Sequence, residues 1–363
     1  MEISKNDTKT LKGVAILFML LLHLFGRKEI NGLYEVFPII NGVPLIYYLG
    51  LFGDACVPIY CFASGYGLFV VHSREQKSNV MKNFARIFKL LINFWIVLVL
   101  FVGIGFLAGK AESFPGSLAE FLLNFFVLSN SYNGAWWFLQ TYIILVLLAP
   151  LLVKFVRKYN SIMLLFLSGI IYLVSYVQRI KHVFDFGDHT ILNMFVNTMV
   201  LVGTSLLPFM IGTIFAKEKV YSKLYNKFYS YSYKNILCFI GIVMLVIIHS
   251  LYESMIIAPF TAIAFICFFN LMDKSRFIQK VFTFFGDHST NIWLTHMFFY
   301  MSIFPELTFA PKYPILIFAW LLILCLISSS VINSIYKPII RLVDKRASNR
   351  PKDSSSVVGQ KTI

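Results

Sequence analysis

The sequence predicts an all-α membrane protein, a polytopic bundle of about ten transmembrane helices plus one re-entrant or interfacial helix. Of its 363 residues, 58% are hydrophobic and only 13% are charged, a composition foreign to soluble domains. The apolar residues also fall in runs long enough to cross the ~30 Å hydrocarbon core of a bilayer. The net charge of +15 does not indicate nucleic-acid binding, because basic residues in the short loops of such a chain set topology and meet anionic lipid.

Ten apolar segments are expected to cross the membrane: 11–28, 44–71, 87–109, 136–153, 160–178, 191–216, 235–251, 254–272, 288–304 and 314–336. The first has no small-residue cleavage site after it, so it is read as a retained span. Gly53, Asp54 and Pro58 interrupt the second, which predicts a short lead-in and a span from about residue 55. An eleventh segment, 118–130, is too short to cross comfortably.

The lysines and arginines predict the orientation. Placing the six main basic clusters in the cytoplasm puts 26 of the 32 basic residues inside and leaves six outside, as the positive-inside rule prefers. This arrangement requires both termini to be cytoplasmic and segment 118–130 to stay on the outer side. It predicts a multi-pass protein of the cell membrane with an N-terminal segment (1–10), a membrane domain (11–337) and a basic, disordered tail (338–363).

Cysteine usage predicts neither a disulfide framework nor a metal site. All five cysteines lie inside apolar runs, and their spacing does not match zinc ligands. They are Cys56, Cys61, Cys238, Cys267 and Cys325. We interpret them as small buried or lipid-facing residues.

The first candidate for chemistry is the pair Lys12 and His23. Eleven residues separate them, which is three helical turns plus roughly 20°, so both side chains project from one helix face about 16 Å apart. With Lys12 at a membrane surface, His23 lies near the midplane, where an ionisable group is a functional-site candidate. The alternative is a histidine hydrogen-bonded between helices and a lysine that anchors the interface.

A second pair of cations, Arg86 and Lys89, enters the span that begins near residue 87. Because they are three residues apart they share a helix face. Together with Lys12 they would suit a phosphate-bearing cosubstrate at the cytoplasmic mouth of the bundle. Ordinary positive-inside anchoring is the alternative explanation.

Three further stretches have a structural and a functional interpretation. Small residues around Ser64 allow close helix packing, Trp137 begins a span as an aromatic belt or a sugar-stacking surface, and His296 is a second intramembrane histidine that favours a shared polar cavity. Asp54 and His249, near the outer ends of their spans, are expected to be solvated rim residues.

In this order the motifs resemble the acyltransferase-3 family of integral membrane acyltransferases. The family's Arg-x10-His motif resembles Lys12-x10-His23, and its Arg-x-x-Arg motif resembles Arg86-x-x-Lys89, with lysine for arginine once in each. The remaining matches are Ser64-Gly65-Tyr66, Trp137-Phe138-Leu139 followed by Tyr142 and Pro150, and Trp293-Leu294-Thr295-His296. The resemblance runs from about residue 8 to 336.

The resemblance implies transfer of an acyl group, usually acetyl, from cytoplasmic acyl-CoA to a hydroxyl of a surface polysaccharide or lipid-linked saccharide. It implies His23 as base or nucleophile, Lys12, Arg86 and Lys89 as ligands of the CoA phosphates, and Ser64, Trp137, Tyr142 and His296 as substrate or cavity residues. Lysine keeps the charge of arginine but loses its bidentate geometry. The two substitutions therefore leave three alternatives: weaker binding of CoA, a different donor, or an inactive or repurposed member of the family.

The sequence is also compatible with two other functions. Some relatives are described as exporters of polysaccharides or lipid-linked sugars, which need no CoA site. A polymerase or glycosyltransferase would need a large outer loop, and the outer loops here are short. The acceptor sugar, the size of the acyl group and the oligomeric state are not determined by the sequence.

Overall fold

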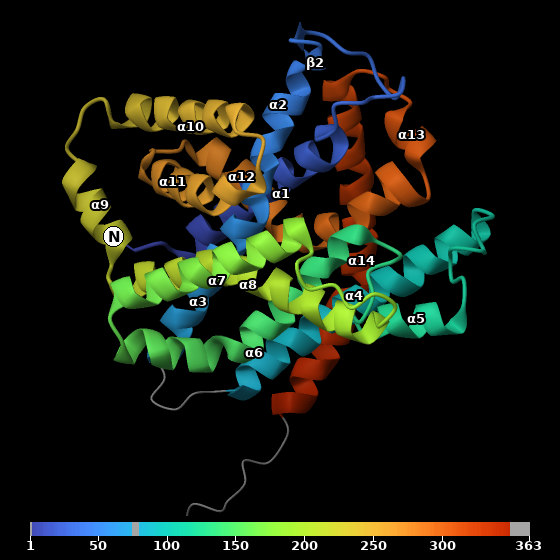
Figure 1. Ribbon diagram of the computed structural model, residues 1–363, viewed down its shortest axis with the longest axis horizontal. Helices are drawn as coiled ribbons and strands as arrows, with labels where there is room; N and C mark the ends of the chain where they lie inside the picture. Colours follow the sequence, from blue (N-terminus) through green and yellow to red (C-terminus); the bar gives the residue numbers. More distant parts are fainter. Residues whose placement is uncertain (1, 75–79, 349–363) are drawn as a thin grey trace, which may run out of the picture.

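The computed structural model describes residues 2–74 and 80–348, and this part of the chain is almost entirely helical (Figure 1). The all-α fold expected from the composition is confirmed. Its elements are α1 (Lys5–Phe25), β1 (Ile39–Ile40), β2 (Val43–Pro44), α2 (Leu45–Leu51), η1 (Phe52–Ala55), α3 (Cys56–Arg74), α4 (Val80–Leu107), α5 (Leu118–Phe125), η2 (Gly134–Trp136), α6 (Trp137–Lys158), α7 (Ser161–Lys181), α8 (Thr190–Lys217), α9 (Val220–Phe228), α10 (Lys234–Leu251), η3 (Met255–Ile257), α11 (Ala258–Leu271), α12 (Arg276–Met297), η4 (Phe298–Ser302), α13 (Pro305–Phe309) and α14 (Pro314–Ser348).

Eight helices in the described residues are long and apolar enough to cross a membrane, and each coincides with a predicted span. The other two predicted spans look different. Residues Met255–Leu271 are apolar but short. Helix α12 begins at Arg276 rather than near residue 288, and its first twelve residues include Arg276, Lys280 and Asp287. These charges explain why its hydropathy is low although its second half is buried.

Segment 118–130 does not form a crossing helix. Helix α5 covers only Leu118–Phe125, starts at a Ser117 cap and ends before Val127, whose φ is 61°. Eight residues at about 1.5 Å each span ~12 Å, well short of a bilayer core. This agrees with the prediction of a re-entrant or interfacial helix.

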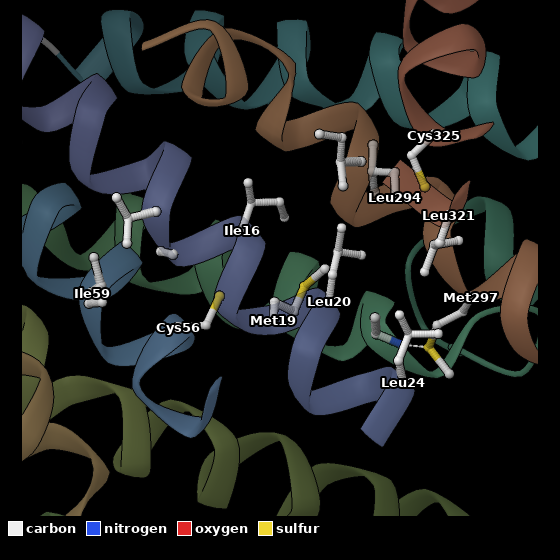
Figure 2. Close-up of a cluster of buried hydrophobic side chains, with 14 of the residues drawn as sticks. Ile16, Met19, Leu20, Leu24, Cys56, Ile59, Leu294, Met297, Leu321 and Cys325 are labelled. Carbon is white, nitrogen blue, oxygen red and sulfur yellow. Dashed lines mark hydrogen bonds between the residues drawn. The ribbon is translucent and has the colours of Figure 1, made fainter. Parts of the chain in front are cut away.

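Helix α1 runs through the centre of the bundle. Its start is fixed by a capping box, in which Ser4 accepts from the Asp7 N–H and the Asp7 carboxylate accepts from the Ser4 N–H. Figure 2 shows its apolar residues between those of α3 on one side and those of α12 and α14 on the other. Labelled members of this core are Ile16, Met19, Leu20, Leu24, Cys56, Ile59, Leu294, Met297, Leu321 and Cys325.

Glycines bring the backbones of α1 and α12 into contact. A Cβ built at Gly13 would overlap the carbonyl oxygen of Phe282, and one built at Gly286 would overlap that of Lys9. Such close approach replaces the hydrophobic driving force that helices lack in lipid, because it maximises van der Waals contact. It also fixes the register between the two helices that carry the candidate histidines.

The small residues of α3 have the packing role that the sequence allowed. A Cβ at Gly65 would overlap the Phe209 carbonyl of α8, and one at Gly212 would overlap the Phe62 carbonyl of α3. Gly67 lies in open space, since a Cβ added there would meet no atom within 4 Å. Close contact between α3 and α8 therefore depends on two glycines rather than on the whole small-residue stretch.

The last helix, α14, continues past the boundary expected at residue 337. It passes Pro338 and remains helical to Ser348, and Asp344 near its end forms an ion pair with Lys89 at 2.7 Å. Residues 338–348 of the predicted tail are thus helical. The remainder of that tail, 349–363, lies outside the described residues.

Candidate active site

A cavity of about 520 Å³ lies in the centre of the bundle, with walls from α1, α3, α4, α6, α7, α8, α12 and α14. Seven of the eight residues singled out from the sequence line it. They are Lys12, His23, Ser64, Arg86, Lys89, Trp137 and Tyr142. The eighth, His296, is fully buried directly behind His23.

His23 and His296 form a hydrogen-bonded pair. The Nδ1 of His23 lies 2.6 Å from the Nε2 of His296, and the Nδ1 of His296 lies 2.8 Å from the Trp293 carbonyl oxygen. A carbonyl only accepts, so for neutral rings the proton of His296 is on Nδ1 and its Nε2 accepts from His23. The proton of His23 is then on Nδ1, which leaves its Nε2 lone pair free.

The ring of His23 is held from several sides. It stacks on His296 with ring centroids 4.9 Å apart, and Tyr300 stacks on both rings. Tyr300 belongs to η4, a π-helical turn that interrupts the helix directly after α12. Such turns often occur at functional sites, because they reposition the following side chains. The free Nε2 has no hydrogen-bond partner in the described part of the chain, so it is available to a molecule in the cavity.

One end of the cavity, here called the cationic end, carries Lys12, Arg86 and Lys89. Neither Lys12 nor Arg86 has a carboxylate within 4.0 Å among residues 2–74 and 80–348. Lys89 differs from both, since Asp344 already neutralises it. Partly buried cations without a counter-ion are costly, and an anionic ligand would remove this cost.

A buried amide network continues inward from the cations. Asn93 lies seven residues after Arg86 on the same face of α4 and donates to Asn291 Oδ1 at 2.6 Å. Asn291 in turn donates to Ser329 Oγ and Asn333 Oδ1. The Oδ1 of Asn93 is buried and accepts no hydrogen bond within the described residues. Asn93 was not singled out as a site residue from the sequence, although its spacing from Arg86 and Lys89 places all three on one face of the helix.

Aromatic side chains form another part of the cavity wall. Trp137 lies under the guanidinium of Arg179, whose Cζ is 5.7 Å from the ring centroid. Tyr142 and Ser64 complete this wall. The Ser64 hydroxyl donates to the Tyr60 carbonyl of its own helix, which leaves its lone pairs available as acceptors. Trp137 is therefore a cavity residue, and not a member of an outward-facing aromatic belt.

The expectation that Asp54 and His249 are solvated rim residues is wrong. The His249 side chain is only 1% exposed and that of Asp54 only 10%, and the His249 Nε2 lies 3.5 Å from the Asp54 Oδ2. Asp54 lines the same cavity as His23. The lead-in formed by α2 and η1 turns inward against α1, so a polar residue near the end of a span is buried by its neighbours. We call this part of the cavity the Asp54 end.

A comparison with protein families shows the family to which the chain belongs. A family profile described as an acyltransferase domain matches residues 8–334. The chain belongs to the acyltransferase-3 family. Neither the curated proteins nor the solved structures include a match to it. The family is one of membrane acyltransferases, which agrees with the multi-pass helical fold.

In this acyltransferase-3 protein, the matched region contains the histidine pair, the three cations and the aromatic wall. The sequence did not indicate which distant residues these groups contact. The ion pair of Lys89 with Asp344 and the burial of Asp54 against His249 join residues that lie far apart in the chain. Both place charges in or beside the cavity and therefore affect what it can bind.

Proposed function

We propose that this acyltransferase-3 protein moves an acetyl or other short acyl group from cytoplasmic acyl-CoA to a hydroxyl of a cell-envelope or capsular glycan. The observation that carries the proposal is that one cavity holds two cations without counter-ions and a histidine with a free ring nitrogen. An anion-binding end joined to a base is the arrangement that transfer from a phosphate-bearing thioester needs.

The cationic end supports binding of the donor. Lys12 and Arg86 would hold the phosphates of CoA, Arg86 through its planar fork and Lys12 as a point charge. Lys89 contributes less while Asp344 neutralises it.

Asn93 supports passage of the pantetheine arm toward His23. Asn93 lines the cavity, and its Oδ1 is buried and accepts no hydrogen bond within the described residues. A buried acceptor without a donor costs about 1–3 kcal/mol, and the pantetheine arm of CoA offers amide N–H groups. The distance from Lys12 to His23 along α1 is about 16 Å, which an extended chain of that kind bridges.

His23 supports the chemical step. As a general base, its Nε2 takes the proton of the acceptor hydroxyl while the oxygen attacks the thioester carbonyl. The C–S bond then breaks, and the proton passes to the CoA sulfur as the thiol leaves. As a nucleophile, the same Nε2 would carry the acyl group between the two substrates. His296 orients the ring in both cases, because its accepting Nε2 keeps the His23 proton on Nδ1.

The membrane orientation follows from the charges. With the basic clusters in the cytoplasm, both termini and the cationic end lie on the cytoplasmic side of the cell membrane. The Asp54 end then lies nearer the outer side, where glycan acceptors are found. Donor and acceptor would thus reach His23 from opposite faces of the bilayer.

The test is acetyl-CoA binding to the purified protein in detergent, measured by calorimetry. We expect binding by the wild type that Lys12→Ala together with Arg86→Ala abolishes, while the exposed control Lys154→Ala has no effect. A folded wild-type protein without acetyl-CoA binding contradicts the proposal and favours a glycan exporter. Full acyl transfer by His23→Ala would exclude its catalytic role.

A further inference from the structure

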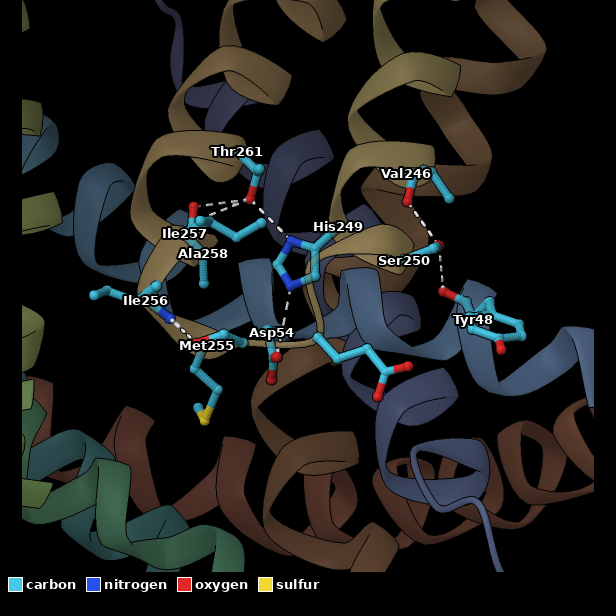
Figure 3. A network of polar contacts seen from close by, with 12 residues as sticks. Tyr48, Asp54, Val246, His249, Ser250, Met255, Ile256, Ile257, Ala258 and Thr261 are labelled. Atoms are coloured by element: carbon cyan, nitrogen blue, oxygen red, sulfur yellow. Dashed lines mark hydrogen bonds and ion pairs between the residues drawn. The ribbon is translucent and has the colours of Figure 1, made fainter. Parts of the chain in front are cut away.

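The structure holds a second buried polar unit, at the Asp54 end of the cavity and separate from the histidine pair. Asp54 belongs to η1, and His249 to the last turn of α10. Figure 3 shows the His249 ring between Asp54 and Thr261 of α11. Its Nε2 lies 3.5 Å from Asp54 Oδ2 and its Nδ1 lies 3.2 Å from Thr261 Oγ1.

This arrangement keeps Asp54 in a defined position. A carboxylate in the interior of a membrane protein is expensive unless it is paired. The protonated imidazole of His249 would pair with it across 3.5 Å, a contact that is an ion pair and not a hydrogen bond. The Thr261 hydroxyl donates to the carbonyls of Ile257 and Ala258 and contacts Nδ1 on the far side of the ring. The carboxylate is thus fixed at the wall of the cavity.

Asp54 faces the same cavity as His23. The preceding residue, Gly53, packs so closely on α1 that an added Cβ would overlap the Phe18 carbonyl and the Leu22 side chain. This contact is within two turns of His23 on the same helix. A molecule held by Asp54 therefore lies next to the histidine pair.

The companions of Asp54 resemble a sugar-binding surface. The lining of the cavity around it includes Tyr172, Tyr176, Trp137 and Arg179. Aromatic faces bind the apolar faces of sugars, a carboxylate accepts from hydroxyls, and a guanidinium donates to oxygens. The Asp54 carboxylate and the Arg179 guanidinium together carry no net charge, which suits a neutral ligand.

We propose that Asp54 is the acceptor-binding residue of this enzyme and that it selects a neutral saccharide with adjacent hydroxyl groups. The carboxylate accepts hydrogen bonds from hydroxyls beside the one that is acylated, and so presents that hydroxyl to His23. His249 is a positioning residue that acts through Asp54. The proposal rests on the acyl-transfer function proposed above and assigns the acceptor half of the cavity.

The test measures transfer of radiolabelled acetyl from acetyl-CoA to p-nitrophenyl glycosides by the full-length protein in proteoliposomes. The neutral set contains glucoside, galactoside, mannoside, rhamnoside and N-acetylglucosaminide, and the anionic set contains glucuronide and galacturonide. Asp54→Asn is compared with Asp54→Glu and with the exposed control Asp188→Asn. Acetyl-CoA binding by each variant serves as the check on folding and on the donor site.

We expect transfer to neutral glycosides and a KM for the acceptor that rises roughly 10- to 100-fold in Asp54→Asn, as for loss of charged hydrogen bonds. Acetyl-CoA binding stays unchanged, and Asp54→Glu recovers part of the affinity. His249→Gln raises the same KM, and adding it to Asp54→Asn has little further effect, because both act on one group.

An unchanged acceptor KM in Asp54→Asn overturns the assignment, as does a wild-type preference for the uronides or transfer to none of the neutral glycosides. In each of these cases acetyl-CoA still binds, so the donor half stands. Absence of acetyl-CoA binding in the folded wild type is a different result, and it overturns the proposed function itself.

Discussion

The Nδ1 of His23 lies 2.6 Å from the Nε2 of His296, although 273 positions separate the two residues. The Trp293 carbonyl fixes the proton of His296, and His296 fixes the proton of His23. The chain of hydrogen bonds thus ends at one free nitrogen on the cavity wall. The first intramembrane histidine is held in one orientation because a second one accepts its hydrogen bond.

Replacing His296 should slow acyl transfer without weakening donor binding. In His296→Leu the His23 N–H loses its acceptor, so the ring can rotate or change tautomer, and we expect kcat to fall about 10²- to 10⁴-fold. His296→Gln retains an oxygen that can accept, and it should lose less. Transfer rates with saturating acetyl-CoA measure the effect. Equal rates for Leu, Gln and wild type would show that His296 does not orient His23.

Removing the cations should raise the KM for acyl-CoA and leave kcat nearly unchanged. A charged hydrogen bond contributes about 1.5–3 kcal/mol, so Lys12→Ala or Arg86→Ala alone should raise this KM roughly ten-fold or more. Lys89→Ala should have the smallest effect, because Asp344 already pairs with that lysine. Initial rates measured against acyl-CoA concentration give the KM and kcat of each variant. A larger effect at Lys89 than at Arg86 would contradict this ranking.

The contact between α1 and α12 should depend on the absence of side chains at two glycines. Gly286→Ala places a methyl group against the Lys9 carbonyl, which forces the backbones apart at a cost of about 1–3 kcal/mol. The histidine pair separates as well, so activity should fall together with the melting temperature in detergent.

Gly67→Ala is the matched control for this substitution, since open space surrounds that position. It should leave the melting temperature unchanged or slightly higher, because alanine favours a helix over glycine. Equal melting temperatures for Gly286→Ala and Gly67→Ala would mean that the two helices adapt without cost.

The contacts of Glu253, which lies between α10 and η3, should stabilise the fold less in acid. The hydrogen bond from Lys28, followed by that from Tyr47, lowers the pKa of the Glu253 carboxyl below its ordinary value of 4.5. A lowered folded-state pKa stabilises the fold above about 4.5, and this contribution is lost as the pH falls through the lower value.

The melting temperature in detergent, followed from about pH 6 to about pH 3, tests this dependence. Glu253→Gln should remove part of the acid-dependent decrease, whereas Glu29→Gln, on an exposed side chain, should follow the wild type. A wild-type and a Glu253→Gln curve of the same shape would show that the contacts of Glu253 with Lys28 and Tyr47 contribute nothing.

Local spacing predicted a substantial part of the site. Lys12 with His23, and Arg86 with Lys89, each lie on one helix, where the period of 3.6 residues decides which side chains share a face. Those pairs do line one cavity. Asp54 and His249 were placed wrongly, because their depth was judged along their own segments. The inward turn of η1 against α1 depends on contacts that no single segment contains.

The sequence by itself determined the helical membrane fold, the short non-crossing helix and the helix faces that carry the candidate residues. Hydropathy, charge bias and helical period are local properties and need no knowledge of neighbours. Only the tertiary structure decided that His23 meets His296, that Asp344 neutralises Lys89 and that His249 supports Asp54. These pairings depend on which helices pack together and in what register. Glycine contacts such as Gly13 with Phe282 set that register, and they become visible only when the helices are assembled.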